Sequence, residues 1–200
     1  MVDANVPKKP ECAAELEKQG LTELVKALHE HTDPQVRQYA AYLLGKAKNP
    51  RAIQPLIESL ADFDKSVREQ ATLALSNLGK AAIEPLAEAM KEPKWETRYR
   101  AAEALGKIAD ERAVQPLIQG LRDRRDHVRY MAAKGLHEIG DSDAIDPLIT
   151  LLKDENTYVR TMASHALGAL GGNKVKSALE KALESEQDEN VKAAMTAALQ

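Results

Sequence analysis

The sequence predicts an all-α protein built from repeated pairs of helices, and two observations carry this prediction. The apolar residues are mostly alanine and leucine, 32 and 24 of the 200 residues, against five tyrosines, one tryptophan and one phenylalanine. Alanine is the best helix former, whereas aromatic and β-branched residues favour strands. In addition, one sequence pattern recurs about every 31 residues, and such a period is the signature of a repeat architecture.

Two markers define this period. One is a basic residue that follows valine or threonine, and the other is a proline. Because both recur with the same spacing, chance does not explain the pattern. The basic residues are Arg37, Arg68, Arg98, Arg129, Arg160 and Lys192, and the prolines are Pro55, Pro85, Pro116 and Pro147.

Along the chain, residues 1–20 are expected to form an N-terminal tail with room for one short capping helix. Residues 21–200 then form the repeat region. Each repeat holds two predicted helices with too little apolar surface to fold alone, so we expect the repeats to stack on one another. The expected repeats are about 21–49, 50–79, 80–109, 110–140, 141–171 and 172–200.

The first helix of each repeat is predicted from an apolar stripe with a proline near its start. In the second repeat, Ile53, Leu56, Ile57 and Leu60 recur at helical spacing. Pro55 lies in or just after the first turn, where backbone N–H groups have no partner within the helix. The missing donor of proline therefore costs little at this position.

The second helix is predicted to begin after an acidic or amide residue in the linker. Such a side chain accepts a hydrogen bond from the free N–H groups of the first turn. In the second repeat, Val67, Ala71, Leu75 and Leu78 then form a narrow apolar stripe, and its alanine allows close helix packing. The predicted capping residues are Asp33, Asp64, Asn156 and Asp188.

Glycines recur at two positions of the second helices, and we interpret both as structural. The earlier position fits close packing, and the later position fits the end of the helix. No glycine-rich phosphate-binding pattern follows a predicted strand. The earlier set is Gly45, Gly106 and Gly168, and the later set is Gly79, Gly140 and Gly171.

These repeats resemble a known family. The clearest copies are NTYVRTMASHALGALG at residues 156–171 and ERAVQPLIQGLRD at residues 111–123. They look like the HEAT repeat, in particular the phycobilisome-lyase (PBS lyase) HEAT-like repeat. The resemblance implies a right-handed α-solenoid whose first helices lie on the convex side and whose second helices line the concave side. Scaffolds, lyases and hydroxylases share this repeat, so it implies no single activity.

The repeated arginines are interpreted as structural. On a helical wheel they lie at the border of the buried stripe. There a guanidinium reaches the acidic residue before its own helix or the next one. We therefore expect a ladder of ion pairs between repeats. Its expected members are Arg37, Arg68, Arg98, Arg129, Arg160, Asp33 and Asp64.

The aromatic residues suggest a binding surface. Four of the five tyrosines lie opposite the apolar stripe of the second helices, so we expect them to be exposed on the concave side. Exposed tyrosine and tryptophan side chains dominate protein-binding interfaces. The side chains around them have mixed charge. The predicted partner-binding residues are Tyr42, Trp95, Tyr99, Glu103, His127, Tyr130, Lys134, Tyr158 and His165.

Other classes of function find less support. The net charge is −3 with both signs interleaved, so no basic stripe is expected to hold nucleic acid. No stretch approaches the ~20 apolar residues that span a bilayer, and with no signal sequence a cytoplasmic protein is expected. His127 and His165 lack a third ligand and Cys12 has no histidine beside it. We therefore expect no metal, no cofactor and no catalytic site.

The resulting prediction is a non-enzymatic, monomeric scaffold or adaptor that binds a protein partner in a concave groove. Two alternatives stay open. The resemblance also implies a subunit of a bilin lyase/isomerase-type or other chromophore-handling complex, and repeats of regular length also suit an engineered or consensus-derived scaffold. The family includes deoxyhypusine hydroxylase, but the His-Glu pairs that bind its iron are absent after the repeated arginine of this sequence.

Overall fold

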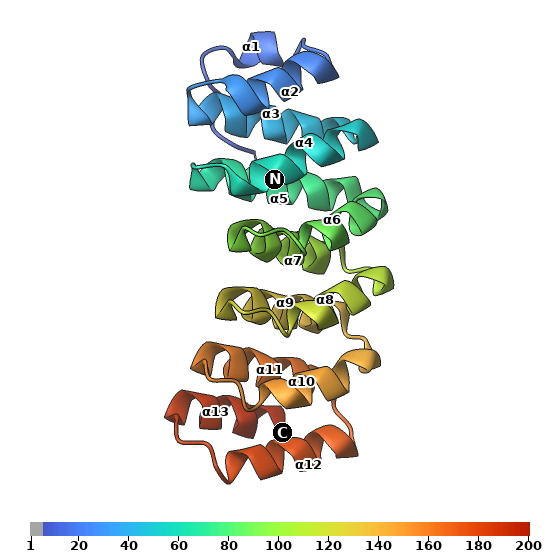
Figure 1. Cartoon of the computed structure of the whole chain (residues 1–200), viewed down its shortest axis with the longest axis vertical. Coiled ribbons are helices and arrows are strands. Elements are labelled where there is room, and N and C mark those ends of the chain that lie inside the picture. Colours follow the sequence, from blue (N-terminus) through green and yellow to red (C-terminus); the bar gives the residue numbers. More distant parts are fainter. Residues whose placement is uncertain (1–5) are drawn as a thin grey trace. The chain divides into compact units, whose positions relative to one another are not determined.

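A computed structural model describes residues 6–200, and every regular element among them is a helix (Figure 1). The predicted all-α solenoid class is thereby confirmed. The described residues divide into two compact bodies, which end at and begin after residue 104 and which we call the N-terminal and the C-terminal body. The first five residues of the predicted N-terminal tail lie outside the described residues.

In the N-terminal body, short first helices alternate with longer second helices. A 3-10 turn precedes α4 and α6, and another follows α4; in such a turn the chain is wound more tightly than in an α-helix. The α-helices are α1 (Ala13–Leu16), α2 (Leu21–Glu30), α3 (Pro34–Ala47), α4 (Ile53–Glu58), α5 (Lys65–Leu78), α6 (Ile83–Ala89) and the start of α7 (Trp95–Ile108), and the 3-10 turns are Pro50–Ala52, Ser59–Ala61 and Gly79–Ala82.

The C-terminal body continues the alternation after the end of α7. Its α-helices are α8 (Val114–Gly120), α9 (Asp126–Ile139), α10 (Ile145–Leu151), α11 (Thr157–Leu170), α12 (Asn173–Leu183) and α13 (Glu189–Ala198), and its 3-10 turns are Glu111–Ala113 and Ser142–Ala144.

The marker prolines lie where a helix tolerates them. Each is the third residue of a first helix, inside the first turn, where no intrahelical hydrogen bond needs its N–H. The isoleucine or valine two residues before each proline begins the helix, and its side chain is buried in the core in three of the four cases. The prolines and their helices are Pro55 in α4, Pro85 in α6, Pro116 in α8 and Pro147 in α10.

Second helices lie side by side within each body. α3 packs along α5 in the N-terminal body, and α11 packs between α9 and α13 in the C-terminal body (Figure 1). The backbones approach closely, because a Cβ added at Gly45 would lie 2.7 Å from the Cα of Ala74, and one at Gly168 would lie 2.7 Å from the Cβ of Ala198. Glycine is therefore required at these two contacts, as the sequence predicts.

The predicted caps of the second helices are confirmed. Asp33, Asp64, Asn156 and Asp188 each accept a hydrogen bond from the backbone N–H two residues further on. α9 differs, because its N-cap is Arg125, which makes no side-chain capping bond. The four caps fix the start of α3, α5, α11 and α13, and so the direction in which each linker enters its helix.

Candidate functional site

A repeated arginine network joins successive helix pairs. In the N-terminal body, Arg37 donates from Nε and Nη2 to the two carboxylate oxygens of Asp62, each at 2.9 Å. Its Nη1 donates to the carbonyl of His31 in its own linker. Both ionic side chains are only 13% exposed. Hydrogen bonding to Asp62 raises the pKa of Arg37, so its guanidinium stays charged.

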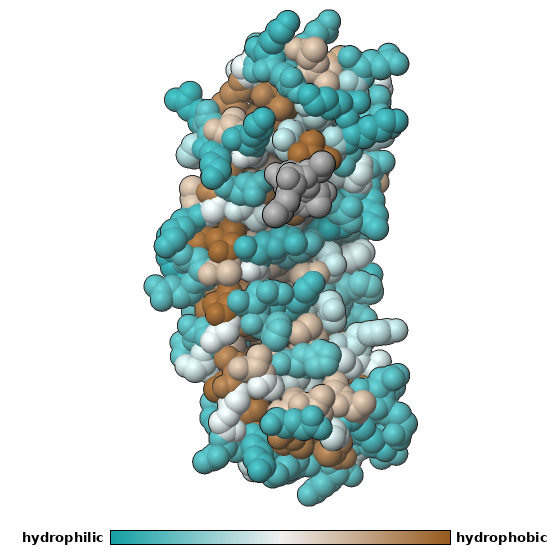
Figure 2. Space-filling model, turned by 180° about the vertical axis from the view of Figure 1, so that it is seen from behind, coloured by the Kyte–Doolittle hydropathy of each residue, from teal (hydrophilic) through white to brown (hydrophobic). Residues whose placement is uncertain are grey.

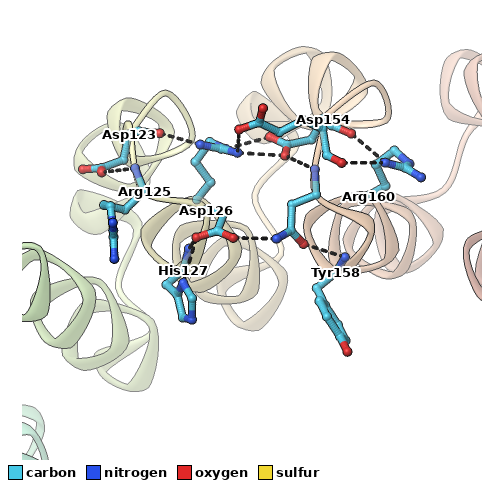
Figure 3. A network of polar contacts seen from close by, with 10 residues as sticks. Asp123, Arg125, Asp126, His127, Asp154, Tyr158 and Arg160 are labelled. Carbon is cyan, nitrogen blue, oxygen red and sulfur yellow. Dashed lines mark hydrogen bonds and ion pairs between the residues drawn. The ribbon is translucent and has the colours of Figure 1, made fainter.

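The C-terminal body contains the same arrangement twice. Arg129 binds both carboxylate oxygens of Asp154, at 2.7 and 2.9 Å, and Arg160 binds those of Glu186 at 2.7 and 2.9 Å. The carbonyl of Asp154 also accepts from Nη1 of Arg160 at 2.8 Å. Asp154 therefore connects two arginines, and Figure 3 shows the contacts of Asp154, including the one to Arg160.

These acidic partners differ from the predicted ones. Asp33 and Asp64 were expected in the ladder, but both cap their own helices instead. The carboxylates that bind arginine lie two residues earlier in each linker. This column of acidic residues also repeats in the sequence, and aligning the linkers would have revealed Asp62, Asp154 and Glu186.

The remaining predicted ladder arginines are anchored in their own linkers. Arg98, which is 5% exposed, donates from Nη1 to the carbonyls of Glu92 and Pro93, at 2.8 and 2.9 Å. Arg68 donates from Nη1 to the carbonyls of Asp62 and Phe63, at 2.6 and 3.0 Å. The common Nη1 contacts hold each guanidinium plane in a fixed orientation.

The predicted exposure of the tyrosines is correct for one of four. Tyr158 is 74% exposed, whereas Tyr42, Tyr99 and Tyr130 are half-buried. Tyr42 lies 5.7 Å, between ring centroids, from the buried Tyr39. The helical wheel of one helix does not show how far neighbouring side chains cover each ring.

An aromatic and charged cluster lies at the start of α7. Trp95 meets Tyr99 edge to face with centroids 6.4 Å apart, and the guanidinium of Arg100 lies 5.4 Å from the centroid of Tyr99. Arg100 also donates to Glu103 at 2.8 Å and lies 3.6 Å from Glu69 of α5. Cation–π contact and ion pairs therefore hold Tyr99 in place.

A polar group with exposed side chains lies at the starts of α9 and α11. Asp126 accepts from the backbone N–H of His127 and contacts its Nδ1 at 2.7 Å, and Asn156 donates to the other carboxylate oxygen. Hydrogen bonding to His127 lowers the pKa of Asp126. In Figure 3, His127 and Tyr158 project to the same side of this network. Lys134 and His165 are also exposed, on α9 and α11.

We call these groups, each taken within its own body, the second-helix surface. It combines aromatic rings with side chains of both charges, which suits recognition of another protein. On the face shown in Figure 2, hydrophobic side chains form small separate patches among hydrophilic ones. The members are Tyr42, Trp95, Tyr99 and Glu103 in the N-terminal body, and His127, Tyr130, Lys134, Tyr158 and His165 in the C-terminal body.

Three further features of the described residues concern metal binding, membrane spans and the surroundings of Cys12. Within residues 6–200, no group of three or more His, Cys, Asp or Glu side chains could hold a metal ion. In that range, too, no helix has both the length and the apolar character needed to cross a membrane. Cys12 lines a cavity of about 460 Å³ together with Glu15, Glu23, Lys26 and His31.

The exposed Phe63 was missed by the sequence analysis. It lies in the linker before α5 and is 101% exposed, more than any other large apolar residue described. The equivalent residues of other linkers include Thr32, Pro93 and Glu155, none of which is aromatic. Aligning the linkers would therefore have singled out Phe63.

The helix pairs, the arginine network and the close-packed glycines together define a repeat protein of the α-solenoid class. The sequence matches the family of HEAT repeats over residues 21–88, 61–129 and 114–200. The chain therefore belongs to the HEAT repeat family, as the resemblance of its repeats predicts.

Individual proteins resemble the chain over part or most of its length. Phycocyanobilin lyase subunit alpha of Picosynechococcus sp. is 33% identical over 103 residues, which cover 46% of this chain and 38% of that protein. A chain in the structure of the complex of CpcE and CpcF of phycocyanin lyase from Nostoc sp. shares 24% identity at a TM-score of 0.70, covering 76% of this chain and 100% of that chain. A designed armadillo repeat protein solved with the peptide (KR)4 shares 25% identity at a TM-score of 0.58, covering 90% and 98%.

These likenesses correct one prediction. The sequence predicts a protein with no enzymatic role, and this prediction is wrong, because the similarity to phycocyanobilin lyase subunit alpha contradicts it. The error arose because repeats of this kind carry no compact local motif by which a lyase subunit differs from a scaffold. The chain spans only 38% of the length of that relative.

Proposed function

We propose that the protein is a subunit of a bilin lyase-type complex and that it binds its protein partners through the second-helix surface. The observation that carries this proposal is the 33% identity to phycocyanobilin lyase subunit alpha. The fold shared with a chain of the CpcE and CpcF complex agrees with a role in an assembly of several chains. The match covers 46% of this chain, so both the activity and the partners are part of the proposal.

The second-helix surface contributes binding and positioning in this proposal. Trp95, Tyr99 and Tyr158 offer aromatic area with polar ends, and such side chains are frequent among the residues that dominate binding energy. The networks around Arg100 and Asp126 fix neighbouring side chains before a partner arrives. A prearranged surface loses less conformational entropy on binding.

Covalent colour transfer tests the proposed activity. Phycocyanobilin and an apo-phycobiliprotein are incubated with this protein, alone and together with a CpcF-type subunit. The acceptor is then analysed for bound bilin on a denaturing gel. We expect covalently coloured acceptor only when this protein is present. Colour that is equal with and without the protein, or absent in every mixture, would contradict the lyase role.

A matched pair of variants tests the surface. Tyr158→Ala removes an exposed ring that makes no core contact, so the melting temperature should stay unchanged while colour transfer falls at least tenfold. Asp143→Ala, at an exposed position of the turn before α10, is the control and should keep full transfer. Equal transfer by both variants would remove Tyr158 from the partner-binding surface without contradicting the lyase role.

A further inference from the structure

Three arginines of the network make the same set of hydrogen bonds. Arg37, Arg129 and Arg160 each use Nη1 to bind carbonyl oxygens of their own linker. Each then uses Nε and Nη2 together to hold the carboxylate of an acidic residue in the next linker, 25 or 26 residues further along the chain. The edge formed by Nε and Nη2 is therefore a carboxylate site that the protein itself fills at these three arginines.

Arg68 has the same anchor but an open edge. Its Nη1 binds the carbonyls of Asp62 and Phe63, so its guanidinium is oriented like the other three. Among residues 6–200, however, Nε and Nη2 of Arg68 hold no carboxylate. The corresponding residue of the next linker is Glu92, which is exposed.

The sequence of that linker explains the gap. Asp62, Asp154 and Glu186 are held toward arginine because each also accepts from the backbone N–H two residues later. In the described chain, Glu92 makes no such bond to the N–H of Lys94. Pro93 lies between them and fixes its own φ, which restricts the turn that the other linkers make.

The linker that anchors Arg68 also carries an exposed aromatic ring. Phe63, whose carbonyl binds Arg68, is fully exposed. Phe63 and Lys94 line a cavity of about 350 Å³ together with Asp62 and Glu58, and Arg68 is not part of that lining. Lys94 occupies the position where four other linkers carry an acidic or amide cap, so this linker brings a positive charge instead.

We propose that Arg68 and Phe63 form a docking site for an acidic segment of a partner protein. An aspartate or glutamate of that segment binds Nε and Nη2 of Arg68, as Asp62 binds Arg37, and an adjacent apolar side chain covers Phe63. The three filled sites of the same chain supply the template for the ligand. Arginine and exposed aromatic residues are both enriched among residues that dominate binding. The site lies outside the second-helix surface and is independent of the lyase proposal.

A peptide taken from the protein itself is the probe. The blocked peptide TLLKDENTY, residues 150–158, carries the carboxylate of Asp154 shortly after two leucines. Its control, the asparagine peptide, has asparagine in place of that aspartate and glutamine in place of Glu155, so that neither carboxylate remains. The Nε–H signals of the arginines in labelled protein are followed by NMR during titration. We expect the signal of Arg68 to shift saturably with the aspartate peptide and at least tenfold more weakly with the asparagine peptide. The signals of Arg37 and Arg160 should stay in place, because their carboxylates are already supplied.

Two variants complete the test. Arg68→Gln should abolish peptide binding. The triple change Glu92→Asp, Pro93→Glu and Lys94→Asn copies the Asp154 linker, so it should supply the missing carboxylate, raise the melting temperature and weaken peptide binding at least tenfold. An unmoved Arg68 signal, or equal shifts with both peptides, would overturn the proposal. An equal effect of acetate would overturn it too, because the site would then bind small carboxylates rather than a protein segment.

Discussion

Glu186 shows how one carboxylate stabilises the contact between successive helix pairs. Its side chain is 6% exposed and receives two hydrogen bonds from Arg160, together with backbone N–H groups of its own linker. These bonds lower the pKa of Glu186 to about 2, against the opposing effect of burial. Removing one partner of such a buried pair leaves the other charge uncompensated, which destabilises the folded protein.

The low pKa of Glu186 predicts a pH dependence of stability. Because the folded state binds this proton more weakly than the unfolded state does, its stabilisation is complete above about pH 4.5 and is lost as the pH falls toward 2. Glu186→Gln should therefore lower the unfolding free energy by on the order of 2 kcal/mol at pH 7, with a smaller loss at each lower pH below 4.5.

Denaturant unfolding of both proteins between pH 2.5 and 8 measures this difference. Glu184→Gln, two residues earlier and exposed, is the control and should follow the unchanged protein at every pH. A difference between Glu186→Gln and the unchanged protein that is constant with pH would show that Arg160 does not stabilise the charged form of Glu186.

At the scale of helices, the residues that end the second helices differ in how well they tolerate a left-handed backbone conformation. Gly140 ends α9 with φ of 73°, a conformation that glycine adopts freely. The equivalent residues after α3 and α7 are Lys48 and Ala109, with φ of 51° and 52°. A side chain makes this left-handed conformation unfavourable by about 1 kcal/mol.

Glycine at these two positions should therefore stabilise the protein. Ala109→Gly and Lys48→Gly are each expected to raise the unfolding free energy by about 0.5–1 kcal/mol, since relief of strain exceeds the added entropy of the unfolded chain. Gly140→Ala should lower it by about 1 kcal/mol, and a Cβ there meets no neighbour that would add a clash. Thermal and denaturant unfolding measure all three changes, and a loss of stability in both glycine variants would contradict the argument from φ.

Much of the helix-level structure could be predicted because a repeat presents each local rule several times. The caps at Asp33 and Asp64 and the proline in α4 follow from backbone hydrogen bonding alone. The pairing of Arg37 with Asp62 could not be predicted in this way. It depends on which side chain of the next helix pair lies opposite, and the helical wheel of one helix carries no such information.

At the scale of the whole molecule, contacts join mainly neighbouring helix pairs. Within the C-terminal body, α9 packs on α8 and α11, and α11 packs on α10 and α13. In such an array stability is a sum over repeats and their interfaces, rather than a property of one shared core. The same pattern explains why the period fixes the fold, while the function of the surface depends on the side chains in which the repeats differ.

A local perturbation should therefore have a local effect. Arg129→Gln breaks the contact with Asp154 between α9 and the linker before α11, so amide hydrogen exchange should accelerate in α9, α10 and α11. Protection in α2 and α3, which belong to the N-terminal body, should remain within about threefold of the unchanged protein. Lys134→Gln, at an exposed position of the same helix α9, is the control and should alter no segment. Exchange that accelerates equally in all helices would show that the chain unfolds as one cooperative unit, and the account of the arginine network as a set of separate interface contacts would then be wrong.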